Sequence, residues 1–141
     1  MNQNKAVFYA SNCGTSQDLA EKIGERLNIS VSDLKTLNID DLKNYKLIIF
    51  AVSTYGRGAP PRGYEDVWKK LQAFTGDLSN VEFAVYGAGS SSFEKTFLGF
   101  AKNIENKMKE LGAKEVAKLG ILDEMEDVEF DFDEWIKSIN N

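Results

Sequence analysis

The sequence predicts an α/β protein with a doubly wound, five-stranded parallel sheet. Apolar runs of strand length alternate along the chain with stretches whose apolar side chains recur at helical spacing. The run at residues 47–52 is apolar at every position, which is typical of a strand buried on both faces. Three of the runs end in loops rich in glycine and hydroxyl residues. Because ligands of such folds bind beyond the carboxyl ends of the strands, these loops predict a binding site at one edge of the sheet.

The amino-terminal half contains the first three predicted strands. Residues 5–10 form the first apolar run, and a short strand is expected at residues 30–34. The third strand occupies residues 46–53. The helix between the first two strands is predicted from apolar residues at helical spacing, namely Leu19, Ile23 and Leu27.

The carboxyl-terminal half contains two further strands and three helices. A loop rich in glycine and proline at residues 54–63 precedes a helix, and the fourth strand at residues 81–86 runs into a glycine- and serine-rich loop at residues 87–92. The last strand is expected at residues 115–122 and a terminal helix at residues 132–139. The two inner helices are predicted from Val67, Trp68 and Leu71, and from Phe97, Phe100, Ile104, Met108 and Leu111 before a stop at Gly112.

Length and composition narrow the class of protein. The 141 residues, 43% of them hydrophobic, are expected to form a single domain spanning residues 1–141. No apolar run approaches the roughly 20 residues of a membrane helix. The single cysteine excludes an internal disulfide and fits a reducing compartment, so a soluble cytoplasmic domain is expected. The 22 acidic residues against 17 basic ones argue against nonspecific nucleic-acid binding.

The chain contains no histidine. A Ser-His-Asp triad, a Cys-His pair and a histidine-containing zinc site are therefore excluded. We predict no catalytic residue and no metal ligand.

The loop at residues 11–16 combines the features of a phosphate-binding turn between a strand and a helix. Its residues are Ser11, Asn12, Cys13, Gly14, Thr15 and Ser16. Backbone amides and hydroxyls converge in such a turn, and the helix N-terminus adds a partial positive charge. No lysine follows the glycine, so the loop differs from the loop that binds nucleoside triphosphates. A phosphate held by neutral donors indicates a phosphomonoester on a cofactor rather than phosphoryl transfer.

Three segments, in chain order, resemble the flavodoxin family. Residues 9–15 are similar to its phosphate loop, residues 53–61 to its first flavin loop and residues 86–93 to its second. The chain looks closest to MioC-like short-chain flavodoxins and to the FMN-binding modules of diflavin reductases. The resemblance covers nearly the whole chain. It implies the strand order 2-1-3-4-5 with helices on both faces, noncovalent FMN binding and electron transfer.

The resemblance places FMN against all three loops. The first loop suits the phosphate, and Tyr55 and Phe93 stand where two aromatic faces could sandwich the flavin ring. Glycines let the backbone approach the ring edge, and in the family a glycine at the position of Gly56 turns its carbonyl toward flavin N5, which favours one-electron transfer. The implied FMN-binding residues are Ser11, Asn12, Cys13, Gly14, Thr15, Ser16, Ser53, Thr54, Tyr55, Gly56, Gly58, Gly87, Gly89, Ser90 and Phe93.

Four of the loop residues differ from the common family pattern. Cys13 stands where threonine is common, Ser90 where an acid or amide is common, and Phe93 where tyrosine is frequent. We interpret Cys13 either as a small buried side chain or as a thiol whose pKa is lowered at a helix N-terminus. Arg57 replaces a segment that is often acidic. Its charge is expected either to ease the second reduction of the flavin or to be screened by solvent.

The segment at residues 123–134 holds eight acidic residues among its twelve. We interpret it either as a solvated loop or as part of a docking face for a basic redox partner. The expected partners are an NAD(P)H- or ferredoxin-linked flavin reductase and redox acceptor enzymes. Their encounters with this protein, a monomer, are expected to be transient and electrostatically steered.

The leading hypothesis is an FMN-containing electron carrier that is not itself an enzyme. One alternative is a small FMN-dependent quinone or azo reductase of the same fold, and another is a flavodoxin-like module with weak or lost FMN binding. A phosphoacceptor receiver domain is disfavoured, because it needs acidic residues at the strand ends where Ser11 and Ser53 stand.

Overall fold

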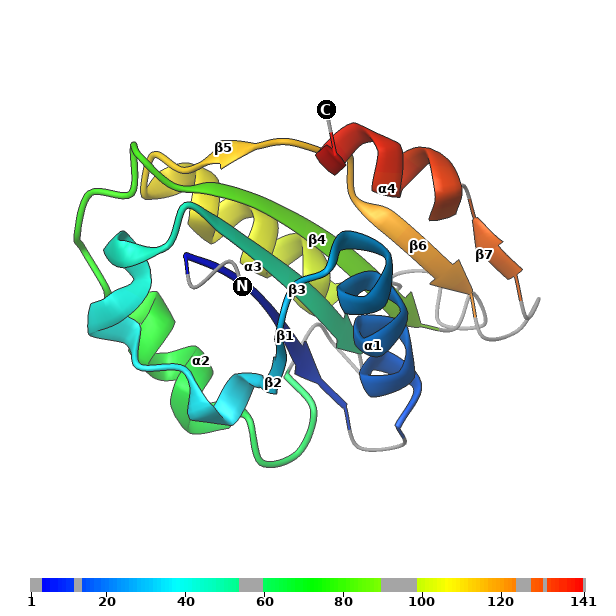
Figure 1. Cartoon of the computed structure of the whole chain (residues 1–141). Helices are drawn as coiled ribbons and strands as arrows, with labels where there is room; N and C mark the ends of the chain where they lie inside the picture. Colours follow the sequence, from blue (N-terminus) through cyan, green and yellow to red (C-terminus); the bar gives the residue numbers. More distant parts are fainter. Residues whose placement is uncertain are drawn as a thin grey trace.

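A single sheet forms the middle layer of the computed structural model, which describes residues 4–11, 14–53, 60–89, 99–123, 128–130 and 132–140 (Figure 1). Its strands are β1 (Lys5–Ala10), β2 (Val31–Asp33), β3 (Leu47–Ser53), β4 (Glu82–Gly89), β5 (Lys114–Glu115), β6 (Gly120–Asp123) and β7 (Val128–Phe130). The α-helices are α1 (Thr15–Leu27), α2 (Glu65–Ala73), α3 (Gly99–Glu110) and α4 (Phe132–Asn140), and two 3-10 helices, η1 (Leu34–Thr36) and η2 (Ile39–Asn44), connect β2 to β3. Within these ranges no helix is both long and apolar enough to cross a membrane.

The strand order confirms the predicted topology. The spatial order is β2-β1-β3-β4-β6-β7, and β5 also pairs with β4. All pairings from β2 through β6 are parallel. With β5 and β6 together in the fifth position, the parallel strands follow the order 2-1-3-4-5.

The fifth strand is divided, which the sequence did not indicate. The continuous strand expected at residues 115–122 consists of β5, paired with the start of β4 (Glu82 with Lys114), and β6, paired with its end (Tyr86 with Gly120). Pairing with β4 resumes at a glycine, where the backbone passes close to a side chain of β4. A Cβ on Gly120 would lie 2.2 Å from the ring of Tyr86.

Strand β7 corrects the interpretation of the acidic segment as a loop. It runs antiparallel to β6, with Ile121 opposite Phe130 and Asp123 opposite Val128. Part of the segment is therefore the edge of the sheet, and its role as a docking face stays a prediction. The strand has only three residues, apolar, acidic and apolar, and acidic residues stand on both sides of it. So short an alternation does not predict a strand from the sequence.

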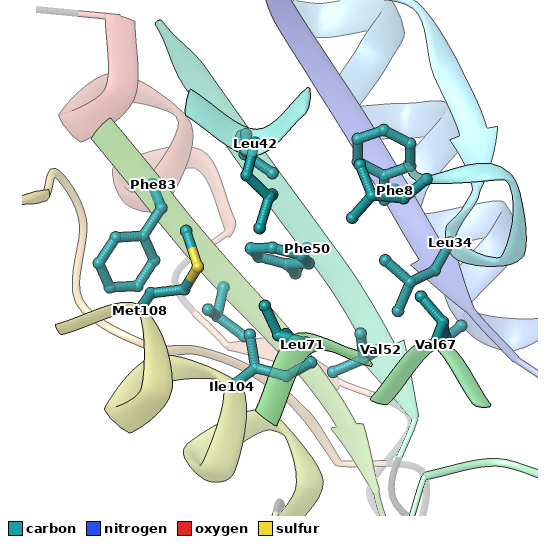
Figure 2. Packing of buried hydrophobic residues seen from close by; sticks show 14 of the residues in the cluster. Phe8, Leu34, Leu42, Phe50, Val52, Val67, Leu71, Phe83, Ile104 and Met108 are labelled. Atoms are coloured by element: carbon teal, nitrogen blue, oxygen red, sulfur yellow. The ribbon is translucent and has the colours of Figure 1, made fainter. Parts of the chain in front are cut away.

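Alternate residues of β3 enter two separate cores. Phe50 and Val52 join the cluster covered by α2, α3 and the 3-10 helices, and Figure 2 shows both beside Leu71 and Ile104. Ile49 joins the opposite cluster, to which α1 and α4 contribute. All seven residues of β3 are buried, which confirms the strand buried on both faces.

Each of the two tryptophans lies edge-on to another aromatic ring. Trp135 of α4 lies edge-on to Tyr86 of β4, with ring centroids 5.0 Å apart. Trp68 of α2 lies edge-on to Phe100 of α3, at 5.3 Å. Such edge-to-face pairs add to the free energy gained from burying the rings.

Helix α3 ends where the sequence predicts. Gly112 adopts a left-handed φ of +93°. The Ala113 amide donates to the carbonyl of Met108, and this hydrogen bond satisfies a carbonyl that the end of the helix leaves without a partner within the helix. The helix is described from Gly99 onward, so the predicted contribution of Phe97 lies outside the described residues.

Candidate functional site

The carboxyl ends of three adjacent parallel strands lie level at one edge of the sheet (Figure 1). Ala10 of β1 pairs with Val52 of β3, and Ser53 pairs with Ala88 of β4. The chain therefore leaves β1, β3 and β4 within a residue or two of the same level. The three loops that the sequence singled out begin at this edge.

Part of the predicted FMN-binding set is described. Ser11, Gly14, Ser16, Ser53, Gly87 and Gly89 are placed, together with the backbone of Thr15. The remaining predicted residues lie outside the described ranges: Asn12, Cys13, Thr54, Tyr55, Gly56, Gly58, Ser90 and Phe93. Arg57 lies outside them as well.

The turn into α1 is built around Gly14. This residue has a left-handed φ of +86°, and its amide donates a 2.9 Å hydrogen bond to the hydroxyl oxygen of Ser11. Among the described atoms, none lies within 4 Å of where a Cβ on Gly14 would stand. Gly14 also caps α1 without a side-chain acceptor. The first-turn amides can therefore receive an anion, which the helix dipole favours.

A buried pair of hydroxyls joins the first two loops. Ser16 in the first turn of α1 is fully buried, Ser53 at the end of β3 is 1% exposed, and their hydroxyl oxygens lie 2.5 Å apart. The Ser16 side chain thus faces Ser53 rather than solvent, while its backbone stays in the first turn of α1. This bond connects residues 37 positions apart and ties the loop at residues 11–16 to the end of β3.

Gly87 and Gly89 are strand residues, which corrects the loop predicted at residues 87–92. Gly87 has a parallel neighbour on each side, since it pairs with both Val52 and Ile121. The ladder with β3 ends at Ala88, and Gly89 pairs with Asp123 of β6 alone. Pairing with β6 therefore carries the strand through both glycines, which by themselves disfavour strand structure.

Tyr64 is a buried residue beside this site that the sequence reasoning missed. It precedes α2 and is only 1% exposed. The Lys35 ammonium lies 4.7 Å from the centroid of its ring. Burial is the main reason that the pKa of Tyr64 is raised far above its usual value, and the nearby Asp33 raises it further. Its spacing from Val67 and Leu71 continues the apolar face of α2 by one turn, a signal that could have identified it.

These features define a class of protein before any comparison. In doubly wound parallel sheets, cofactors that carry a phosphate bind at the edge where the order of connections reverses. Here the N-terminus of α1 follows β1 at that edge and has no side-chain cap, so its amides can bind the phosphate. The chain belongs to the flavodoxin family, since the family model for flavodoxins matches residues 7–135. FMN is the cofactor of this family, and the neutral donors of the first turn and the left-handed Gly14 fit a phosphomonoester.

Individual relatives agree with this assignment. The chain is 35% identical to NADPH-dependent diflavin oxidoreductase 1 of Danio rerio and 30% identical to NADPH–cytochrome P450 reductase of Homo sapiens, in each case over 94% of this chain. It spans only 24% and 21% of the lengths of these two proteins. The structure of oxidised flavodoxin 1 from Bacillus cereus superposes with a TM-score of 0.82, at 23% identity and 97% coverage of both chains, and shows the same fold.

Proposed function

We propose that this chain is an electron carrier that holds FMN noncovalently and passes electrons from a flavin reductase to an acceptor enzyme. The observation that carries the proposal is the uncapped first turn of α1 beside Gly14, at the edge where β1, β3 and β4 end together. The named relatives are NADPH-dependent, which supports an NADPH-linked donor. A cytoplasmic location is part of the proposal and rests on the single cysteine.

The proposed phosphate site consists of the amides of the first turn and the hydroxyl of Ser11. The Ser11 oxygen already accepts the Gly14 amide, so its proton is available to a phosphate oxygen. The flavin ring is assigned to the two later loops, with Tyr55 and Phe93 as its proposed aromatic contacts. When bound, FMN supplies reversible acceptance of electrons; the chain supplies binding, orientation and local electrostatics.

The proposal treats the chain as a carrier and not as an enzyme in its own right. In support of a carrier, the proposal assigns all three loops at the carboxyl ends of the strands to FMN, and none of them to a second substrate. The relatives are four to five times longer than this chain, and the activities their names describe belong to those whole proteins.

An anaerobic reduction titration tests the proposal. The purified chain is mixed with FMN, freed of excess flavin and reduced stepwise while the visible spectrum is recorded. We expect bound flavin and a separate one-electron spectrum between the oxidised and fully reduced forms. Absence of bound flavin would overturn the proposal, and direct two-electron bleaching with quinone turnover would favour a reductase instead. Riboflavin, which lacks the phosphate, is the matched ligand control and is expected to bind more weakly.

A further inference from the structure

We propose that Lys35 is a positioning residue for the first flavin loop, because it holds the turn through which that loop leads into α2. The turn spans residues 61–64, and the loop, residues 53–61, ends in it. Lys35 belongs to η1, outside the three segments that carry the family resemblance. The inference rests on the proposed function, in which this loop binds the flavin ring.

Hydrogen bonds close this turn and join it to α2. The Tyr64 amide donates to the carbonyl of Pro61 at 3.0 Å, and Gly63 between them has a left-handed φ of +93°. The Gly63 amide donates to Oε1 of Glu65, the first residue of α2, at 2.8 Å. The Trp68 amide donates to the carbonyl of Tyr64 at 3.1 Å, which continues the turn into the helix. A contact that restrains Tyr64 therefore also restrains Pro61, the last residue of the loop.

The end of the Lys35 side chain lies against the last two residues of the turn. Its ammonium is 4.7 Å from the centroid of the Tyr64 ring, and Tyr64 is only 1% exposed. A Cβ on Gly63 would stand 3.0 Å from Nζ and 3.1 Å from Cε of Lys35. Because the face of an aromatic ring attracts a cation, Lys35 links η1 to the turn.

Lys35 is held in place at its own backbone. Its amide donates to Oδ1 of Asp33 at 3.0 Å, and the hydroxyl of Thr36 donates to the Asp33 carbonyl at 2.7 Å. Asp33 is the last residue of β2 and pairs with Tyr9 of β1. The turn is therefore anchored to the edge of the sheet at which β1 leads into the loop at residues 11–16.

Both ends of the first flavin loop are thus anchored by other elements. At its start, Ser53 is buried, and its hydroxyl oxygen lies 2.5 Å from that of Ser16 in α1. At its end, Pro61 belongs to the turn that Lys35 holds. A loop with anchored ends loses less conformational entropy when a ligand binds to it. Releasing the exit should therefore weaken binding of the flavin ring, whether or not the phosphate is present.

The variant Lys35→Met tests the inference because it removes the charge and keeps a side chain of similar length. Dissociation constants for FMN and for riboflavin are measured by quenching of flavin fluorescence. We expect both flavins to bind about threefold to fivefold more weakly, the effect of one cation–aromatic contact at an exposed side chain. Lys35→Arg keeps a cation for the ring and should bind both flavins within about 1.5-fold of wild type. Lys43→Met, which removes a positive charge from the neighbouring η2, is the matched control and should leave both constants unchanged.

Amide hydrogen exchange in the FMN-free chain reports on the turn itself. The Tyr64 amide should exchange about threefold to fivefold faster in Lys35→Met, because its hydrogen bond to Pro61 opens more often. The Ala113 amide, which donates to Met108 at the end of α3, should keep its wild-type rate. Equal acceleration at both amides would mean a general loosening of the fold and would refute the inference.

The two flavins also separate positioning from simple charge attraction. A loss confined to FMN would trace the effect to attraction between Lys35 and the phosphate, since riboflavin is uncharged. That result, unchanged affinity for both flavins, or Lys35→Arg binding as weakly as Lys35→Met would each overturn this inference and leave the proposed function standing. A wild-type chain that binds no FMN would overturn the proposed function, and this inference with it.

Discussion

The buried pair formed by Ser16 and Ser53 provides a sharp test of how the site is held together. In the variant Ser16→Ala, the hydroxyl of Ser53 stays buried but loses its partner at 2.5 Å. Leaving a buried hydroxyl unpaired costs about 1–3 kcal/mol of unfolding free energy. For a domain of this length, an unfolding entropy of about 2 cal/mol/K per residue converts that loss into a fall of about 3–10 °C in Tm.

The assay is thermal and urea unfolding of the FMN-free protein, followed by far-UV circular dichroism. Ser16→Ala, Ser53→Ala and the double variant form a cycle. Because the double variant leaves no buried hydroxyl without a partner, it should be less destabilised than the sum of the two single variants. Ser138→Ala is the control, since this exposed hydroxyl donates only to its own helix, at the carbonyl of Glu134, and should change stability by less than about 0.5 kcal/mol. Additive losses in the cycle would refute the reasoning.

Two further variants test the packing and the electrostatics away from the loops. Gly120→Ala should destabilise the protein by about 1–3 kcal/mol in urea unfolding, because its Cβ would lie 2.2 Å from the buried ring of Tyr86. Burial raises the pKa of Glu115 to about 7, the nearby Glu105 carboxyl raises it further, and Lys109 opposes both. The folded state thus keeps a proton that the unfolded state releases near pH 4.5, so this group makes stability fall as pH rises from about 4.5 to 7. Glu115→Gln should remove that fall, gaining about 2 kcal/mol relative to wild type between pH 5 and 8 after allowance for partial exposure.

Each of these variants has a direct control. Unfolding of Glu110→Gln, at an exposed carboxylate of α3 whose side chain is 71% accessible, should follow the wild-type dependence on pH. Parallel pH profiles for wild type and Glu115→Gln would contradict the electrostatic argument. For Gly120→Ala, an unchanged urea midpoint would show that the Tyr86 ring can move, despite its edge-on contact with Trp135 at 5.0 Å.

Much of the fold could be predicted because its signals are local. The uniformly apolar run of β3 and the helical spacing of Leu19 and Ile23 both reflect burial by an adjacent layer, and the structure buries all of these residues. Strand β7 and the division of the fifth strand could not be predicted in this way. Both depend on which strand lies alongside, and short alternations among acidic residues carry little of that information.

The candidate site, too, was predictable from the sequence only where its residues are neighbours in the chain. The sequence by itself indicated which loop is the proposed phosphate site, since hydroxyls, a glycine and a following helix are neighbours in the chain. Only the tertiary structure decided that Ser16 turns inward to Ser53 and that Tyr64 is buried with the Lys35 ammonium over its ring. The contact between Ser16 and Ser53 joins residues 37 positions apart, and it exists because parallel pairing sets the strand ends level. Spacing along the chain cannot report such contacts, because the packed sheet and not the local sequence brings their atoms together.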